Sequence, residues 1–97
     1  MSDKDLEKRV VMSDRAAQVL QDPLITGAID EMRQTAFDNW RTSSFKDTEE
    51  REELYKMVRA IDEFEAHFKR RVNDGKVAKS QLDQLTNGVK KNVRIQR

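Results

Sequence analysis

Apolar residues recur at helical spacing between positions 54 and 72, and this pattern restricts the fold more than any other feature of the chain. A helix with one apolar face carries hydrophobic residues three or four positions apart. The residues that follow this spacing are Leu54, Met57, Val58, Ile61, Phe64, Phe68 and Val72. Asp47 and Glu50 precede them in a capping-box pattern, and Asn73-Asp74-Gly75, a typical helix stop, follows them. The sequence therefore predicts a long helix from residue 47 to about residue 73.

A second helix is predicted from Pro23 to about Arg41. Asp22 is a preferred N-cap residue, and proline is favoured at the first helical position because it lacks the N–H that would stay unpaired there. Its apolar face comprises Ile25, Ile29, Met32, Ala36 and Trp40, widened by Leu24, Ala28 and Phe37. A loop of five residues, 42–46, separates the two helices and favours antiparallel packing. We therefore expect a long antiparallel helical hairpin over residues 22–75.

The segments on either side of this hairpin carry weaker patterns. Residues 1–21 predict a shorter N-terminal helix, and because Ser13 is also a candidate cap, a break near Met12 is an alternative. Residues 76–97 predict a short helix and then a basic, partly extended tail. Within that tail, alternating Val93 and Ile95 indicate either a strand added to a partner or a free arm. The expected fold class is all-α, in three parts: 1–21, 22–75 and 76–97.

The net charge of +1 conceals a strong asymmetry along the chain. Residues 69–97 contain nine Lys or Arg and two Asp or Glu, a net charge of +7, which leaves −6 for residues 1–68. The C-terminal arm carries Lys90, Lys91, Arg94 and Arg97 and no acid. Three interpretations stay open: a solvated tail, a contact with an acidic protein surface, and sequence-independent binding to nucleic-acid phosphates.

Residues that catalysis or metal binding would need are scarce. The chain has no cysteine, and Glu63 with the single histidine, His67, supplies too few ligands for a tetrahedral metal site. Gly75-Lys76 lacks the upstream glycine and the following hydroxyl residue of a phosphate-binding loop. We expect no enzymatic activity, no cofactor and no metal. Residues 1–10 lack the apolar run of a signal peptide, and no stretch approaches the ~20 apolar residues of a membrane span. A soluble, intracellular protein is expected.

The chain has few residues that can form a hydrophobic core, because 36% of its residues are hydrophobic and 38% are charged. A two-helix hairpin covers little of its own apolar face, so oligomerisation or docking on a larger protein is expected. Trp40 and Phe45 flank the loop, where they either tuck into the open end of the hairpin or anchor a partner. Tyr55 lies one position off the apolar face. The candidate partner-binding residues are Trp40, Phe45, Tyr55, Phe64, Phe68, Lys90, Lys91, Arg94 and Arg97.

Part of the chain, roughly residues 16–79, also carries a family resemblance. Its elements are Leu20-Gln21-Asp22-Pro23-Leu24, a helix ending at Trp40, the run Asp47 to Leu54 with Arg51-Glu52, and Gly75-Lys76. This pattern resembles small helical proteins that tailed phages and prophages encode near their head and packaging genes. The resemblance implies a role in virion assembly, in the virion or the host cytoplasm, with other phage structural proteins or further copies as partners. It implies no catalytic residues. The alternatives are a DNA-associated packaging accessory or regulator that binds through the basic arm, and a host-directed inhibitor.

Overall fold

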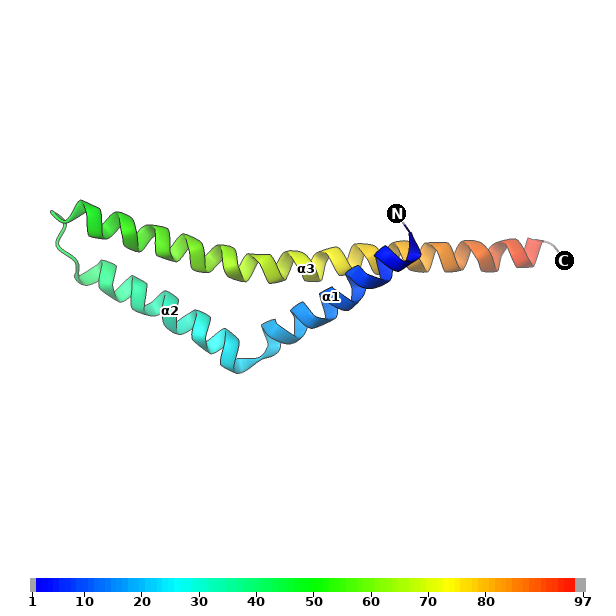
Figure 1. Cartoon of the computed structure of the whole chain (residues 1–97), viewed down its shortest axis with the longest axis horizontal. Coiled ribbons are helices and arrows are strands. Elements are labelled where there is room, and N and C mark those ends of the chain that lie inside the picture. Colours follow the sequence, from blue (N-terminus) through cyan, green and yellow to red (C-terminus); the bar gives the residue numbers. More distant parts are fainter. Residues whose placement is uncertain (1, 96–97) are drawn as a thin grey trace.

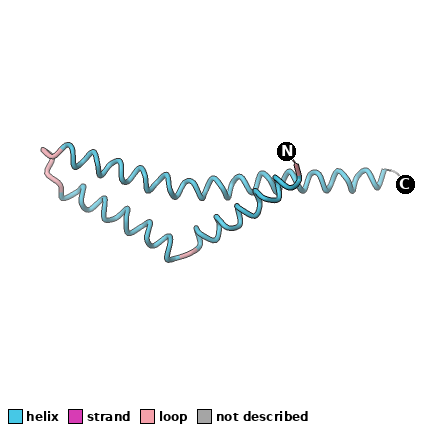
Figure 2. The backbone as a smooth tube through the Cα atoms, viewed as in Figure 1, coloured by secondary structure: helices cyan, strands magenta, loops and turns pink. Residues whose placement is uncertain are grey.

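The computed structural model describes the backbone of residues 2–95 and the side chains of residues 2–87. The described chain forms three helices, α1 (Asp3–Gln21), α2 (Pro23–Thr42) and α3 (Thr48–Ile95), and contains no strand (Figure 1). The all-α prediction is confirmed. Short connections at residue 22 and at residues 43–47 separate the helices (Figure 2).

Local signals set the start of each helix. Ser2 caps α1 by accepting a hydrogen bond from the Asp5 amide at 3.3 Å. Asp22 caps α2 by accepting one from the Leu24 amide at 2.9 Å. Asp47 caps α3 by accepting one from the Glu50 amide at 3.0 Å. Each cap supplies an acceptor to an N–H that has no partner inside the helix. The predicted starts of α2 and α3 are thus confirmed.

The α1 helix runs without interruption through Met12 and Ser13, so the alternative of a break there is wrong. The Ser13 hydroxyl caps no helix and instead donates a hydrogen bond to the Val72 carbonyl oxygen of α3, at 3.2 Å. A serine inside a helix can direct its hydroxyl to a neighbouring element in this way. The residue that the sequence offered as a helix start is therefore a contact between two helices.

The α3 helix passes through Asn73-Asp74-Gly75 and Asn87-Gly88 without a break. The predicted end near residue 73 and the predicted partly extended tail are both wrong, and the expected boundary between residues 75 and 76 lies inside this helix. Gly75 keeps a helical backbone and has no positive φ. With 48 residues, α3 is about 72 Å long at 1.5 Å per residue.

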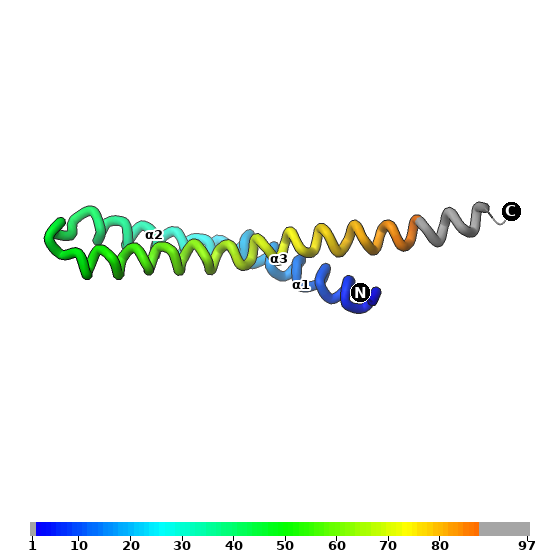
Figure 3. The backbone as a smooth tube through the Cα atoms, turned by 90° about the horizontal axis from the view of Figure 1, so that it is seen from above, coloured from blue at the N-terminus to red at the C-terminus, as the bar shows by residue number. Residues whose placement is uncertain are grey.

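Helices α1 and α2 form a bent arm that runs antiparallel to α3 (Figures 1 and 3). The bend at Asp22 points away from α3, and α1 packs against α3 more extensively than α2 does. The molecule measures 78 × 25 × 17 Å, with a radius of gyration of 21.4 Å. A compact domain of this length would have a radius of about 12.5 Å. The chain is therefore a thin rod with little interior.

Helices α1 and α3 approach each other closely at Ser13 and Gly75, both buried. A Cβ added to Gly75 would overlap the Cβ and Oγ of Ser13 and would lie 3.5 Å from its Cα. Ala16 and Ala78, each three residues further along its helix, are also buried. Gly75 is therefore needed because the helices almost touch at this point, and not because the chain turns there.

An ion pair between Arg9 of α1 and Asp74 of α3 lies beside the same crossing. The Arg9 guanidinium donates from Nη2 to Asp74 Oδ1 at 2.7 Å and from Nε to Asp74 Oδ2 at 2.9 Å. This fork geometry is the strongest form of a side-chain ion pair. The hydrogen bond from Arg9 lowers the pKa of the Asp74 carboxyl below its ordinary value, against the opposing effect of desolvation.

Between α2 and α3 the core is small. Its buried side chains are Ile29 and Ala36 of α2 and Leu54 and Ile61 of α3. Arg33 bridges the two helices at its edge, with Nη2 3.2 Å from Asp62 Oδ1 and 3.3 Å from Glu65 Oε1. So small a core leaves many large apolar side chains half-exposed or more, and these define the candidate binding surfaces.

Candidate protein-binding surfaces

An open apolar hollow of about 250 Å³ lies between α2 and α3 near the loop that joins them. Phe37, Trp40, Leu54, Tyr55 and Val58 line it. Leu54 is only 8% exposed, whereas the three aromatic side chains remain 41% to 59% exposed. We call this site the aromatic hollow. Its buried aliphatic floor and exposed aromatic rim are the chemistry of a site for an apolar side chain.

Helical spacing brings the rim residues of the aromatic hollow together. Phe37 and Trp40 are three residues apart on α2, and their ring centroids lie 6.0 Å apart with a tilt of 32°. The Arg51 guanidinium of α3 lies 4.9 Å from the centre of the Trp40 ring, in a cation–π contact. Trp40 is thus held from two sides while 41% of its surface remains exposed.

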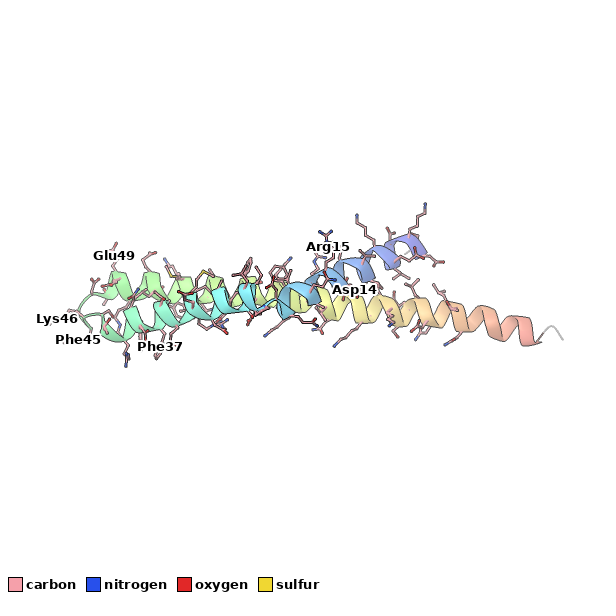
Figure 4. The ribbon with its side chains drawn as sticks, turned by 90° about the horizontal axis from the view of Figure 1, so that it is seen from below. Asp14, Arg15, Phe37, Phe45, Lys46 and Glu49 are labelled. Atoms are coloured by element: carbon pink, nitrogen blue, oxygen red, sulfur yellow. The ribbon has the colours of Figure 1, made fainter. Side chains whose placement is uncertain are left out.

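Phe45 lies apart from this hollow, at the tip of the loop (Figure 4). Its side chain is 76% exposed, so the expectation that it tucks into the end of the hairpin is wrong. The tight turn explains this position. Ser44 accepts hydrogen bonds from the Lys46 amide on its side chain and from the Asp47 amide on its carbonyl, and the turn so formed carries Phe45 outward. Lys46 Nζ lies 6.0 Å from the centre of the Phe45 ring.

Phe64 and Phe68 lie further along α3, with ring centroids 5.1 Å apart in an edge-to-face arrangement. Phe64 is about half-exposed, whereas Phe68 is more covered. Phe68 lines a second open hollow of about 300 Å³ between α1 and α3. The other lining residues are Met12, Arg15, Ala16, Val19, His67 and Arg71. We call this site the cationic hollow, because Arg15 and Arg71 border an apolar floor.

The predicted partner-binding residues therefore occupy separate places. Trp40 and Tyr55 share the aromatic hollow, Phe64 and Phe68 lie near the cationic hollow, and Phe45 stands alone. Lys90, Lys91 and Arg94 fall in the part of α3 whose side chains are outside the described residues, and Arg97 lies beyond the described chain. Their role in binding an acidic surface or nucleic acid stays a prediction.

The spacing of apolar residues places Phe37, Leu54 and Val58 on apolar helix faces and predicts no surface site at them. Their spacing indicates burial, whereas the packing of α2 and α3 near the loop leaves them around an open hollow. The signal that could have located the site is Trp40 followed by Arg51. An arginine four residues after the Asp47 cap lies within one helical turn of the loop, where it can reach an aromatic ring on the neighbouring helix.

Side-chain groups for other chemistry are few in the described part of the chain. Within that part, no three or more His, Asp or Glu side chains are grouped in a way that could hold a metal ion. His67 packs edge-on to Phe68, with ring centroids 5.6 Å apart. No helix among the described residues combines the length and apolar character that crossing a membrane requires.

Comparison of the chain with protein-family models, with curated proteins and with solved structures found no match.

Proposed function

We propose that this protein acts without catalysis, by binding other proteins through the aromatic hollow, as a minor structural or assembly component of a tailed-phage virion. The observation that carries the proposal is the half-exposed cluster of Phe37, Trp40 and Tyr55 around a buried Leu54. Contiguous exposed aromatic surface is uncommon on soluble monomers and typically marks a binding site.

The geometry of the hollow favours binding energetically. Arg51 and Phe37 already restrain the Trp40 side chain, so a partner would pay little entropy to order it. Tryptophan, tyrosine and arginine are also the residue types most enriched where binding energy concentrates. An apolar residue of a partner helix would fit the open hollow between α2 and α3 and complete the cover of Leu54.

The resemblance to small helical phage proteins supports the choice of partner class. A rod of 78 Å with little core suits a component that lies along a larger assembly, such as a head, portal or tail protein. In this proposal, the head, portal or tail protein supplies the apolar cover that the chain does not provide for itself.

The test is association with particles during an infection that uses a tagged version of the chain. We expect the protein in purified virions or assembly intermediates by mass spectrometry, and we expect Trp40→Ala/Tyr55→Ala to reduce its amount at least tenfold. Leu24→Ala is the matched control, because Leu24 is 78% exposed on α2 and lies outside the hollow. Absence of the wild-type chain from virions and intermediates would contradict the proposal.

A DNA-associated packaging accessory or regulator is the second candidate, favoured by the net charge of +7 over residues 69–97. This function predicts DNA binding that weakens steeply with salt and is lost on deletion of residues 89–97. No binding at low ionic strength would remove this candidate. Recovery of a host enzyme in a defined complex with the chain, in place of virion proteins, would instead support a host-directed inhibitor.

A further inference from the structure

A row of exposed side chains with heptad spacing runs along α3. Its members, separated alternately by four and three positions, are Glu53, Met57, Ala60, Phe64, His67 and Arg71, and all six are exposed. Alternating steps of three and four keep residues in one line along a helix, as they do at the contact line of two coiled helices. We call this row the α3 seam.

The α3 seam faces away from the aromatic hollow. Buried Leu54 and Ile61 mark the side of α3 that faces α2, and Tyr55 and Val58 lie on one flank of it. At about 100° per residue, the seam lies on the other flank. In Figure 4, Glu49 of α3 and Arg15 of α1 project from one edge of the molecule, and Phe37, which lines the aromatic hollow, projects from the opposite edge.

The chemistry of the seam changes in order along the helix. Its first position is Glu53, with Glu49 and Glu50 in the preceding turn. Its middle is apolar, from Met57 to Phe64. Its last position is Arg71, which lines the cationic hollow together with Arg15 of α1. Along the seam, an acidic end, an apolar middle and a basic end therefore follow one another. Two such seams laid antiparallel place the acidic end of each opposite the basic end of the other.

We propose that a second copy of this chain binds antiparallel along the α3 seam, with a twofold axis near residue 62. In this register Glu53 lies opposite Arg71 of the second copy, and Met57 lies opposite its His67. Phe64 lies opposite the small side chain of Ala60, which leaves room for the ring. The contact spans 19 residues, about 27 Å. A twofold interface uses the same patch on both copies. The seam meets this condition, because its acidic and basic ends pair with each other across the axis.

Charge complementarity selects a second copy over an unrelated partner. Two glutamate-rich ends meet two arginine-rich ends, and each apolar centre covers the other. Asp74, the next position of the spacing, forms a short, partly buried ion pair with Arg9 of α1, so the seam ends at Arg71. The ion pair of Glu53 with Lys56 is long, at 3.8 Å, and exposed, so Glu53 can exchange it for a partner's arginine. This inference goes beyond the proposed function, because it uses a different face and leaves the aromatic hollow free for its own partner.

The first test is sedimentation equilibrium of the full chain over a range of concentrations. We expect a monomer–dimer equilibrium that Glu53→Arg or Arg71→Glu alone weakens about tenfold, since each change turns two attractive contacts of the dimer into repulsive ones. The double variant Glu53→Arg/Arg71→Glu should return to within about threefold of wild type. Glu52→Arg, the same change one residue away and off the seam, should have no effect.

A monomer at every concentration, or a double variant as weak as the single ones, would overturn the proposal. The second test uses the absence of native cysteine. When Glu53→Cys and Arg71→Cys chains are mixed, we expect disulfides between the two variants in preference to disulfides within either variant. Preferential disulfides between two Glu53→Cys chains would indicate parallel pairing and contradict the antiparallel dimer. Trp40→Ala/Tyr55→Ala should dimerise like wild type, so failure of the dimer and failure of virion binding are separable.

Discussion

Replacement of Gly75 by alanine tests the tight contact between Gly75 of α3 and Ser13 of α1. A single added methyl group would occupy space already filled by the Cβ and Oγ of Ser13. The two helices would have to move apart, and the 3.2 Å hydrogen bond from Ser13 to the Val72 carbonyl would lengthen or break. The change therefore acts on the crossing that holds α1 against α3.

Two effects of opposite sign decide the size of the change. Alanine is favoured over glycine inside a helix by about 1 kcal/mol. Overpacking typically costs about 1–3 kcal/mol, and a lost hydrogen bond about 1 kcal/mol more. We therefore expect Gly75→Ala to lower the free energy of unfolding by about 1–3 kcal/mol. In a chain of this length each 1 kcal/mol lowers the Tm by about 4–8 °C.

Urea and thermal denaturation followed by circular dichroism would measure this loss. Gly27→Ala is the matched control, since a Cβ there meets nothing within 4 Å, and it should stabilise the protein by about 0.5–1 kcal/mol. Adding Ser13→Gly to Gly75→Ala removes the overlap, so the double variant should be at least ~1 kcal/mol more stable than the sum of the single changes. A Gly75→Ala variant that is as stable as Gly27→Ala would refute the close crossing.

Two further predictions follow from the core and from the ion pair. Ile29→Ala should lower the free energy of unfolding by about 2–5 kcal/mol, because Ile29 is 1% exposed, whereas Leu24→Ala on the same helix should change it by less than ~0.5 kcal/mol in urea denaturation. Because Arg9 lowers the pKa of Asp74 in the folded state, the stability from this pair is present above the ordinary pKa of an aspartate and is lost as the pH falls through the lower folded value. Asp74→Asn should therefore be less stable than wild type at pH 7, with a difference that shrinks below about pH 4; an equal difference at both pH values would contradict this assignment.

Local sequence signals were enough to place most helix starts. Asp22-Pro23 and Asp47 act within three residues of themselves, through hydrogen bonds to the Leu24 and Glu50 amides. Such caps depend on short-range geometry that the sequence carries directly. The reciprocal half of the predicted capping box is absent, because the Asp47 amide donates to the Ser44 carbonyl of the loop instead. The sequence predicted Trp40 beside the loop and Tyr55 one position off the apolar face, and it did not predict that the two residues line one hollow.

The sequence by itself determined that the chain is helical, where α2 and α3 begin, and that its apolar residues are too few to close a core. Tertiary structure decided the use of Gly75 and Ser13, which lie 62 positions apart. Glycine permits both a left-handed turn and a close approach of two backbones, and its neighbours in sequence favour the first. Packing against α1 selects the close approach of two backbones. A continuous α3 keeps Ser13, Ala16 and Ala78 buried between the helices, whereas a turn at Gly75 would separate them.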